Sequence, residues 1–298
     1  MKVVLPFPAD RLTDVPGEFD IEVVDATEEW PDSATKAEFY VPSYRFSRRV
    51  VDVIPSMPNL QVVQSLTAGV DHVRPALPDG VTLCNAAGVH DAATSELAVG
   101  MMIACQRRIP DLVLAQEEQH WDQQMSLSLA DQRVLIVGAG NIAHAIKRRL
   151  DGFECEVTLV GRTARVGVHG MTELPDLLPQ ADIVVLIVPI TDETRGLVDK
   201  AFLGRMPDGA LLVNVARGGV VVTDDLLAEL RAGRLRAALD VTDPEPLPAD
   251  HPLWSAPGAL VTPHVGGASM AMWPRVYRLV SAQLRRLAAG EPLLNVVT

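Results

Sequence analysis

The stretch Val134-Leu-Ile-Val-Gly138-Ala-Gly140-Asn-Ile-Ala143 decides the fold, because it predicts a buried strand, a tight turn and the start of a helix. In this GxGxxA pattern, Gly138 permits the sharp turn and Gly140 lets the backbone come close to a pyrophosphate. Ala143 is small enough for the helix to pack on the strand, and the helix N-terminus offers N–H groups to phosphates. Glycines also end strands for steric reasons alone, but here the sequence pattern predicts both the strand before the glycines and the helix after them. The stretch therefore predicts a dinucleotide site.

The end of the next expected strand, residues 156–160, bears on which dinucleotide is bound. An NAD site usually has Asp or Glu there, which accepts hydrogen bonds from a ribose. This chain has Gly161-Arg162-Thr163-Ala-Arg165 instead. Two arginines and a threonine favour the anionic 2′-phosphate of NADP, which an acid would repel. We therefore expect NADP(H) to be favoured over NAD(H); the alternative is that both arginines are solvated loop residues.

Short apolar runs alternate with helical stretches along most of the chain, a pattern that favours parallel sheets covered on both faces. The expected strands form a first series at residues 2–5, 21–24, 38–41, 61–66 and 81–84, and a second at 134–137, 156–160, 183–187, 211–215, 237–240 and 259–261. The expected helices include residues 92–106, 142–151, 223–232 and 270–289.

Two series of strands predict two α/β domains, each a doubly wound parallel sheet of the Rossmann or flavodoxin type. The helical run 270–289 follows the last strand and can pack back on the first domain. We therefore expect a dinucleotide-binding domain at residues 92–269, inserted in a substrate-binding domain made of residues 1–91 and 270–298.

Composition excludes several classes of protein. The 298 residues include 26 Lys and Arg against 38 Asp and Glu, a net charge of −12, which argues against a nucleic-acid partner. Three widely spaced cysteines argue against a disulfide scaffold or a Cys-based zinc site, so no metal is expected. No apolar run suits a membrane span, and the N-terminal residues do not resemble a signal peptide. These features favour a cytoplasmic protein without a membrane partner.

Three charged side chains follow strands of the second series. They lie in Val213-Asn-Val-Ala-Arg217-Gly-Gly, Ala238-Leu-Asp240-Val-Thr-Asp-Pro-Glu245-Pro and Val261-Thr-Pro-His264-Val-Gly-Gly. In open α/β sheets ligands bind beyond the carboxyl ends of the strands, where these side chains are expected. Taken singly, each also fits an ordinary structural role, such as an ion-paired Arg, a solvated acidic turn or a loop His.

Taken together with Leu178-Pro-Gln-Ala-Asp182, Pro189-Ile-Thr191-Asp-Glu-Thr194-Arg-Gly and Gly209-Ala-Leu-Leu-Val-Asn214, these motifs resemble the D-isomer-specific 2-hydroxyacid dehydrogenase family. The resemblance runs nearly from end to end. In the first series, Leu66-Thr-Ala-Gly69-Val-Asp71 and Asn85-Ala-Ala-Gly88 fit more loosely. The segment 161–165 looks most like the NADPH-preferring glyoxylate/hydroxypyruvate reductases.

The resemblance implies an oxidoreductase that reduces a small 2-oxo acid to the D-2-hydroxy acid by hydride transfer from NADPH. Arg217 would bind the substrate carboxylate and carbonyl oxygen, for which its planar, permanently charged fork is suited. His264 would protonate that oxygen, and Glu245 would orient the imidazole and favour its protonated form. Backbone N–H groups of Ala68 and Gly69 would hold the other end of the carboxylate.

The resemblance also implies a wider set of contacts. Asp240 corresponds to the position that contacts the nicotinamide amide. The implied cofactor-binding residues are Thr94, Gly138, Gly140, Asn141, Ile142, Arg162, Thr163, Arg165, Val188, Pro189, Thr194, Val215, Ala216, Asp240 and Gly266. Family members are usually homodimers, and residues 110–131, with Trp121, correspond to the arm that reaches the partner. Tyr44 and Trp273 either wall the substrate pocket or pack in the core.

Alternative functions remain open at this point. One is a phosphoglycerate-type or other D-2-hydroxyacid dehydrogenase that uses NAD. Formate-oxidising relatives have Gln beside the His, and Glu245 argues against them. Another is a catalytically silent protein that senses nicotinamide cofactor, which the acidic balance and the lack of basic tails disfavour. His90 and Asp91 could be read as a second acid–base pair, but the resemblance argues against this, because the family places its catalysis elsewhere.

Overall fold

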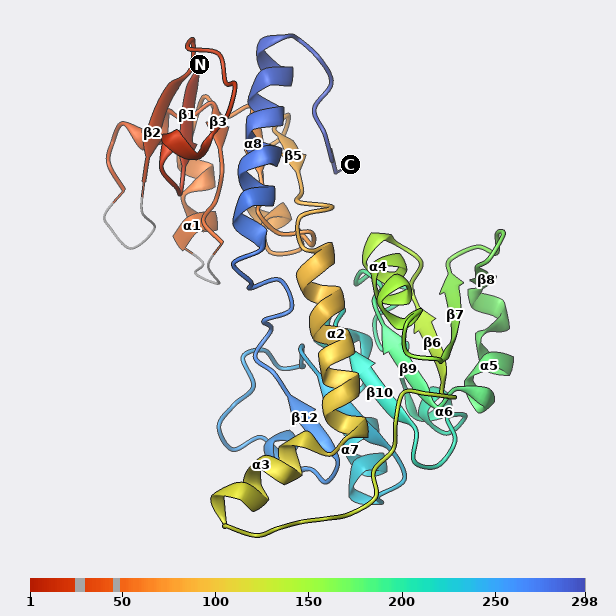
Figure 1. The fold of residues 1–298 in the computed structure, drawn as a ribbon. Helices are drawn as coiled ribbons and strands as arrows, with labels where there is room; N and C mark the ends of the chain where they lie inside the picture. Colours follow the sequence, from red (N-terminus) through yellow and green to blue (C-terminus); the bar gives the residue numbers. More distant parts are fainter. Residues whose placement is uncertain (25–29, 45–48, 298) are drawn as a thin grey trace. The chain divides into compact units, whose positions relative to one another are not determined.

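The computed structural model describes residues 1–24, 30–44 and 49–297 (Figure 1). The chain divides into two compact units. Unit 1 consists of Met1–His90 and Met270–Thr298, and unit 2, Asp91–Ser269, is inserted within it in the sequence. Each unit is an α/β structure with a parallel sheet, which confirms the fold class expected from the sequence.

Unit 1 contains a five-stranded parallel sheet in the order β2-β1-β3-β4-β5, the flavodoxin-like order. Alternate residues of a strand face opposite sides, so Val3 joins one hydrophobic cluster and Val4 the other. Val276 and Val280 of the long C-terminal helix cover the Val3 side, and Figure 1 shows that helix beside the sheet. The elements are β1 (Lys2–Leu5), β2 (Asp20–Val23), β3 (Phe39–Tyr40), α1 (Arg49–Asp52), β4 (Val62–Gln64), β5 (Thr82–Cys84) and α8 (Met272–Ala288).

Unit 2 contains a seven-stranded parallel sheet in the order β12-β11-β10-β9-β6-β7-β8, which follows the Rossmann strand order with one strand added. Its strands are β6 (Arg133–Val137), β7 (Glu156–Gly161), β8 (His169–Gly170), β9 (Ile183–Leu186), β10 (Leu211–Asn214), β11 (Arg236–Leu239) and β12 (Ala259–Val261). Its helices are α2 (Asp91–Gln106), α3 (Ile109–Glu117), α4 (Asn141–Leu150), α5 (Leu174–Leu177), α6 (Lys200–Leu203) and α7 (Thr223–Arg231).

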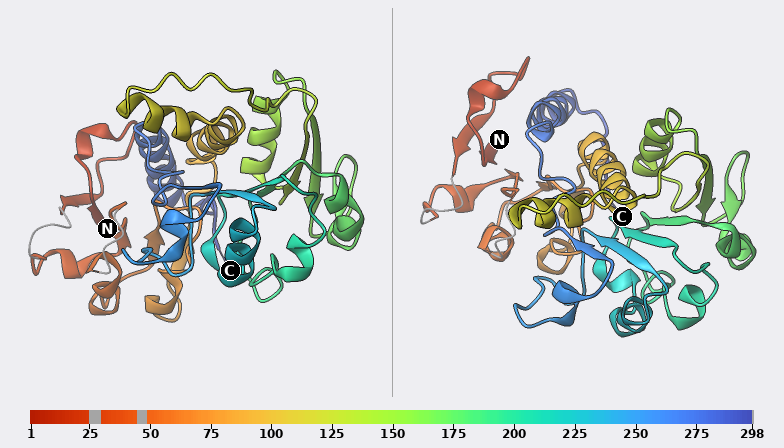
Figure 2. Two further views of the ribbon diagram at one scale, coloured as in Figure 1. Left: turned by 90° about the horizontal axis from the view of Figure 1, so that it is seen from below. Right: turned by 60° about the horizontal axis from the view of Figure 1, so that its bottom comes forward.

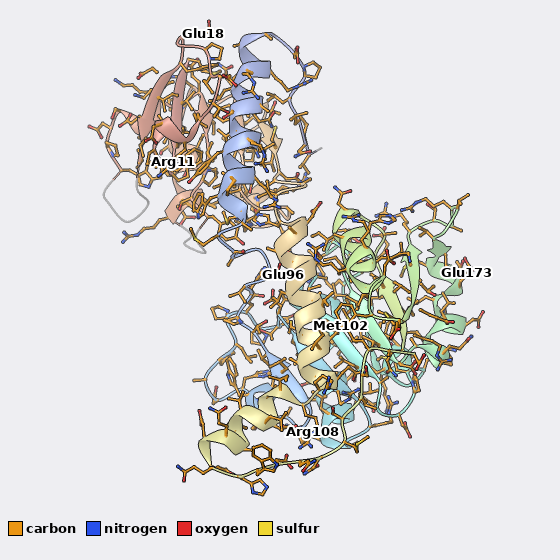
Figure 3. The ribbon with its side chains drawn as sticks, viewed as in Figure 1. Arg11, Glu18, Glu96, Met102, Arg108 and Glu173 are labelled. Atoms are coloured by element: carbon orange, nitrogen blue, oxygen red, sulfur yellow. The ribbon has the colours of Figure 1, made fainter. Side chains whose placement is uncertain are left out.

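Helices cover both faces of the sheet of unit 2, as Figure 2 shows. Val134 and Ile136 of β6 pack on the side of α2 and α4, where Met102 of α2 is fully buried (Figure 3). Leu135 and Val137 face α6 and α7 on the other side. Continuous apolar strands are thus apolar because both of their faces are covered. The polar residues lie instead in the loops that follow the carboxyl ends of the strands.

Four elements of unit 2 were not among those expected from the sequence: β8, α3 and the four-residue helices α5 and α6. The strand β8 has only two residues, too few for a period to be visible. The helix α3 begins with Ile109 and Pro110, and Pro is favoured at the first helical positions. No residue of α3 is buried, although Ile109, Leu112 and Val113 recur at the i, i+3, i+4 spacing of an apolar stripe. Within residues 1–24, 30–44 and 49–297, no helix is long and apolar enough to cross a bilayer.

Candidate active site

The glycine-rich turn joins β6 to α4 in unit 2. Gly138 has φ +125°, and a Cβ there would lie 2.3 Å from the carbonyl oxygen of Ile187, so the protein itself requires glycine at this position. A Cβ on Gly140 would meet no atom within 4 Å. Internal packing therefore does not explain Gly140, whereas close approach of a ligand to the backbone does. Gly140 is also the N-cap of α4, whose first N–H groups lie at the same place. This turn fits a dinucleotide pyrophosphate.

The edge of β7 carries the residues expected to select the cofactor. Arg162 and Thr163 are exposed, and no acid follows the strand. The Arg165 side chain is bound instead, because its Nη2 donates to the carbonyl oxygen of Ala139 in the glycine-rich turn at 2.9 Å. The backbone of Arg165 is fixed by two hydrogen bonds with Val168, at 2.9 and 2.8 Å. The two arginines thus differ: Arg162 is an exposed cation, and Arg165 supports the turn.

The segment after β9 contains Val188, Pro189 and Thr194. The Thr194 hydroxyl donates to the carbonyl oxygen of Pro189 at 2.6 Å and accepts the N–H of Thr191 at 2.8 Å. Thr194 therefore closes this turn and fixes where Val188 and Pro189 lie.

Arg217 follows β10 directly and is set by a buried asparagine. Asn214, 1% exposed, accepts the N–H of Ala216 at 3.0 Å and donates to the carbonyl oxygen of Arg217 at 3.0 Å. Arg217 Nη1 donates to the Ala216 carbonyl oxygen at 2.7 Å. At the next residue, a Cβ on Gly218 would lie 1.9 Å from the carbonyl oxygen of Thr242, so only glycine permits this approach. The ends of β10 and β11 are therefore held against each other.

Asp240 is 3% exposed, and its carboxylate holds the loop that carries His264. Oδ1 accepts hydrogen bonds from the Thr262 hydroxyl at 2.6 Å and from the Val265 N–H at 2.9 Å, and Oδ2 accepts from the Gly266 N–H at 2.8 Å. Thr94 of α2 lies close by, since a Cβ on Gly266 would be 3.4 Å from Thr94 Cγ2. Three expected cofactor residues, Thr94, Asp240 and Gly266, thus meet in unit 2.

His264 and Glu245 form a direct pair. Nδ1 of His264 lies 2.5 Å from Oε1 of Glu245. Burial by itself would raise the pKa of Glu245, but the hydrogen bond and charge of His264, together with the charge of Arg217, outweigh it and hold the pKa below its usual value. Glu245 is therefore ionised at neutral pH. Because Glu245 engages Nδ1, proton exchange with a ligand uses Nε2. Arg217, Glu245 and His264 accordingly form one charged group at the carboxyl ends of β10, β11 and β12.

In unit 1, Ala68 and Gly69 lie in a partly buried loop after β4. His90 is 5% exposed, its Nε2 lies 2.6 Å from the carbonyl oxygen of Leu66, and its ring stacks on Tyr44 with centroids 5.3 Å apart. His90 thus supports this loop and is built into the core.

Trp273 stacks on Tyr277, with ring centroids 5.9 Å apart, and meets the edge of Phe7. It belongs to the hydrophobic cluster between α8 and the sheet.

Two asparagines of the site have roles that the sequence did not suggest. Asn214 and Asn85 stand directly after the apolar runs of β10 and β5, and the side chain of each bonds nearby backbone groups. An amide at the end of a buried strand is the signal that could have identified them. Among the residues with described positions, no group of three or more His, Cys, Asp or Glu side chains is arranged to hold a metal ion.

Known proteins resemble this chain in sequence and in fold. The family model of the D-isomer specific 2-hydroxyacid dehydrogenase NAD binding domain matches residues 99–266. The human glyoxylate reductase/hydroxypyruvate reductase is 32% identical over 262 residues, which cover 83% of this chain and 79% of that protein. The D-3-phosphoglycerate dehydrogenase of Archaeoglobus fulgidus is 29% identical over 257 residues, covering 83% of this chain and 49% of that protein.

A solved structure extends the likeness to the whole chain. The NADPH-dependent glyoxylate/hydroxypyruvate reductase from Sinorhizobium meliloti, in complex with NADP and sulfate, has a TM-score of 0.83 at 26% identity. The match covers 99% of this chain and 98% of that one. By family model, by sequence and by fold, this chain belongs to the D-isomer-specific 2-hydroxyacid dehydrogenases, a family of NAD(P)-dependent enzymes.

Proposed function

We propose that this enzyme reduces a small 2-oxo acid of the glyoxylate or hydroxypyruvate type to the D-2-hydroxy acid, with NADPH as the reductant. The observation that carries the proposal is the charged group of unit 2, in which His264 Nδ1 lies 2.5 Å from Glu245 and the charge of Arg217 acts on the same carboxylate. Reduction of a 2-oxo acid requires a group that binds the substrate carboxylate and a group that donates a proton to the carbonyl oxygen. A guanidinium suits the first role and a positioned imidazole suits the second. The relatives named as glyoxylate/hydroxypyruvate reductases support this substrate class.

The three side chains divide the work of the proposed reaction. NADPH, when bound, supplies the hydride that adds to the carbonyl carbon. Arg217 binds the substrate carboxylate and polarises the carbonyl oxygen, because its charge is permanent and its fork is planar. His264 donates the proton that the same oxygen gains, so that C=O becomes CH–OH. Glu245 holds the imidazole in one orientation and balances its charge while the proton is present.

The cofactor residues fit NADPH by their chemistry. The Gly138–Gly140 turn and the N-terminus of α4 receive the pyrophosphate. Arg162, with Thr163 beside it, receives the 2′-phosphate, since both are exposed and no acid directly follows β7. The Glu193 carboxylate, whose pKa is lowered by the Thr191 hydrogen bond and, less strongly, by the charge of Arg162, lies on another segment. Arg165 lies at the same edge and supports the turn through Ala139. The remaining residues proposed to contact the cofactor are Thr94, Asn141, Ile142, Val188, Pro189, Thr194, Val215, Ala216, Asp240 and Gly266.

On the substrate side, we assign the N–H groups of Ala68 and Gly69 to the carboxylate. Neither residue has a side chain that could bind an anion, so the backbone must do so. Two N–H groups offered side by side form the kind of anion-binding nest that oriented amides create.

The test is an assay of cofactor oxidation by the purified enzyme across a panel of 2-oxo acids, with NADPH and NADH in parallel. We expect turnover with glyoxylate or hydroxypyruvate and a preference for NADPH. Arg162→Ala should remove that preference, and His264→Ala should lower the rate by about 10²–10⁴-fold. A preference for NADH, or 3-phosphohydroxypyruvate as the best substrate, would instead favour a phosphoglycerate-type enzyme, the activity named for the A. fulgidus relative. Tight binding of a nicotinamide cofactor without turnover of any 2-oxo acid would indicate a cofactor sensor.

We also propose that the enzyme is a homodimer formed through α3 and the segment that follows it. Trp121 is 88% exposed and Met125 96% exposed, and Leu114 of α3 is 59% exposed. Large apolar side chains this exposed within one stretch of the sequence, residues 114–125, suit a surface that another protein covers. A second copy is the partner that the family resemblance indicates. Trp121→Ser should shift the mass measured by light scattering from dimer towards monomer, while a wild-type protein that is monomeric at micromolar concentration would refute the assignment.

The cytoplasm is the proposed location. All three cysteines are free, and burial raises the pKa of the Cys84 and Cys105 thiols to about 11, so these thiols suit a reducing compartment and are not reactive.

A further inference from the structure

The loop after β4 in unit 1 is anchored by its carbonyl groups. Five consecutive carbonyl oxygens, those of residues 65–69, each accept a hydrogen bond from another group of unit 1. The donors are Gln64 Nε2 to Ser65 at 2.8 Å, His90 Nε2 to Leu66 at 2.6 Å, Ala86 N to Thr67 at 2.9 Å, Asn85 Nδ2 to Ala68 at 3.0 Å and Thr67 Oγ1 to Gly69 at 2.7 Å. The backbone of this loop is therefore held in one orientation along its whole length.

The anchors decide where the N–H groups point. A peptide group is planar and almost always trans, so the C=O of one residue and the N–H of the next point in opposite directions. The Thr67 carbonyl is bound to Ala86, and the same peptide carries the N–H of Ala68. The Ala68 carbonyl is bound to Asn85, and that peptide carries the N–H of Gly69. In the part of the chain that the structure describes, neither N–H donates to a protein acceptor. Both therefore point away from the anchors.

Of the side chains described at residues 1–24, 30–44 and 49–297, that of Asn85 is the one that hydrogen-bonds to either of these two peptides. Its Nδ2 donates to the Ala68 carbonyl, while its Oδ1 accepts the N–H of Ala87 at 3.0 Å, so both ends of the amide are used. The N–H of Asn85 is bound in turn to the carbonyl oxygen of Asn295 at 3.0 Å. The side chain is thus fixed on two sides, and the direction of the Gly69 N–H depends on it.

We propose that Asn85 is a positioning residue for the substrate carboxylate, because it orients the Gly69 N–H to which that carboxylate binds. The proposal rests on the proposed function for the identity of the substrate. Asn85 touches no reacting atom. Its contribution is to binding, and an interaction made equally in the ground state and the transition state changes KM and leaves kcat unchanged.

The first test is the steady-state kinetics of Asn85→Ala with glyoxylate at saturating NADPH. A hydrogen bond to a charged group is worth about 1.5 kcal/mol or more, so KM for glyoxylate should rise on the order of tenfold. The kcat value and the dissociation constant of NADPH should stay the same. Asn295→Gly is the matched control, since Asn295 Nδ2 donates to the Ala87 carbonyl oxygen at 3.1 Å in the same turn and its φ of +54° suits glycine. This control should leave KM unchanged.

The second test reads the Gly69 amide directly and needs no turnover. Protein labelled with ¹⁵N-glycine gives an amide signal for Gly69, which Gly69→Ala identifies. Titration with glyoxylate should move this signal in the wild type and should require about tenfold more glyoxylate in Asn85→Ala. A wild type that reduces no 2-oxo acid would refute the proposed function, and the titration would still decide the role of Asn85. A Gly69 signal that glyoxylate does not move, a folded Asn85→Ala with unchanged KM, or an equal rise in KM and in the NADPH dissociation constant would each overturn the proposal.

Discussion

Arg165→Ala tests whether the second arginine of the β7 edge supports the glycine-rich turn or recognises the cofactor phosphate. In the structure, Arg165 Nη2 donates to the Ala139 carbonyl oxygen at 2.9 Å, and a Cβ on Gly161 would lie 3.0 Å from Arg165 Nη1. The guanidinium thus lies across Gly161 and reaches the turn that we propose receives the pyrophosphate. Its removal should loosen that turn, and the pyrophosphate is common to NADPH and NADH.

The size of the effect follows from the single bond that is lost. A typical intramolecular hydrogen bond contributes about 1 kcal/mol net, and an exposed guanidinium gains little more from its charge. If the whole loss falls on the bound cofactor, the dissociation constants of NADPH and NADH should both rise about fivefold. Arg162→Ala is the matched comparison. It removes an exposed cation proposed to bind the 2′-phosphate, so it should weaken NADPH about tenfold or more and leave NADH unchanged.

Fluorescence titration of NADPH and of NADH into the unliganded wild type and into each variant measures the six dissociation constants without turnover. Relative to the wild type, the dissociation constant of NADPH divided by that of NADH should be unchanged in Arg165→Ala and should rise in Arg162→Ala. If Arg165→Ala weakens NADPH alone, the guanidinium leaves Ala139 when the cofactor binds and is itself a phosphate ligand. The supporting role would then be refuted.

Variants at Glu245 and at the Gln64–Gln283 pair test other parts of the structure. Glu245→Gln removes the carboxylate bound to His264, so kcat should fall by at least about tenfold. Because the pKa of Glu245 is lowered in the folded protein, the pair stabilises the fold above the ordinary carboxyl pKa and loses that contribution as pH falls through the lowered one. The Tm of Glu245→Gln should therefore lie below that of the wild type at pH 7 and approach it in strong acid; a constant difference would contradict this account. Gln283→Leu leaves the buried Oε1 of Gln64 without the donor that lies 2.6 Å away, and should lower the free energy of unfolding by about 1–3 kcal/mol in urea denaturation. The double variant Gln64→Leu/Gln283→Leu should lose less free energy of unfolding than the sum of the losses in Gln64→Leu and Gln283→Leu, and a loss equal to that sum would show that the amides are not coupled.

Much of the fold was predictable because its signals are local. The run 134–137 is apolar at every position and is followed by Gly138 and Gly140, so strand, turn and helix could each be inferred from adjacent residues. The expected helices 92–106 and 223–232 agree with α2 and α7 to within one residue at each end. Boundaries differ more at β3, where only Phe39–Tyr40 pairs within the expected range 38–41.

The bonds that shape the site were not predictable, because they join residues far apart in the sequence. Arg165 and Ala139 are separated by 26 positions, and Asn85 and Ala68 by 17. A polar residue at a strand end indicates that some backbone group will be bound, but its partner depends on which strands become neighbours. Asp240 illustrates the difference. The family resemblance suggested a cofactor contact, whereas the structure adds three hydrogen bonds to residues 262–266.

The division of unit 1 into two segments has a consequence for biosynthesis. The sheet β1–β5 is complete once residue 84 has been made, but the helix that covers the Val3 side of that sheet begins only at Met272. Ribosomes add about 5–20 residues per second, so the Val3 side of the sheet stays uncovered for roughly 10–40 s before α8 is synthesised. During that interval unit 2, Asp91–Ser269, can be completed as one continuous segment. Until α8 is synthesised, the nascent chain must therefore avoid aggregation, either because aggregation is slow or because a chaperone covers the apolar face. Unit 1 begins first in the sequence but is the last unit to be completed.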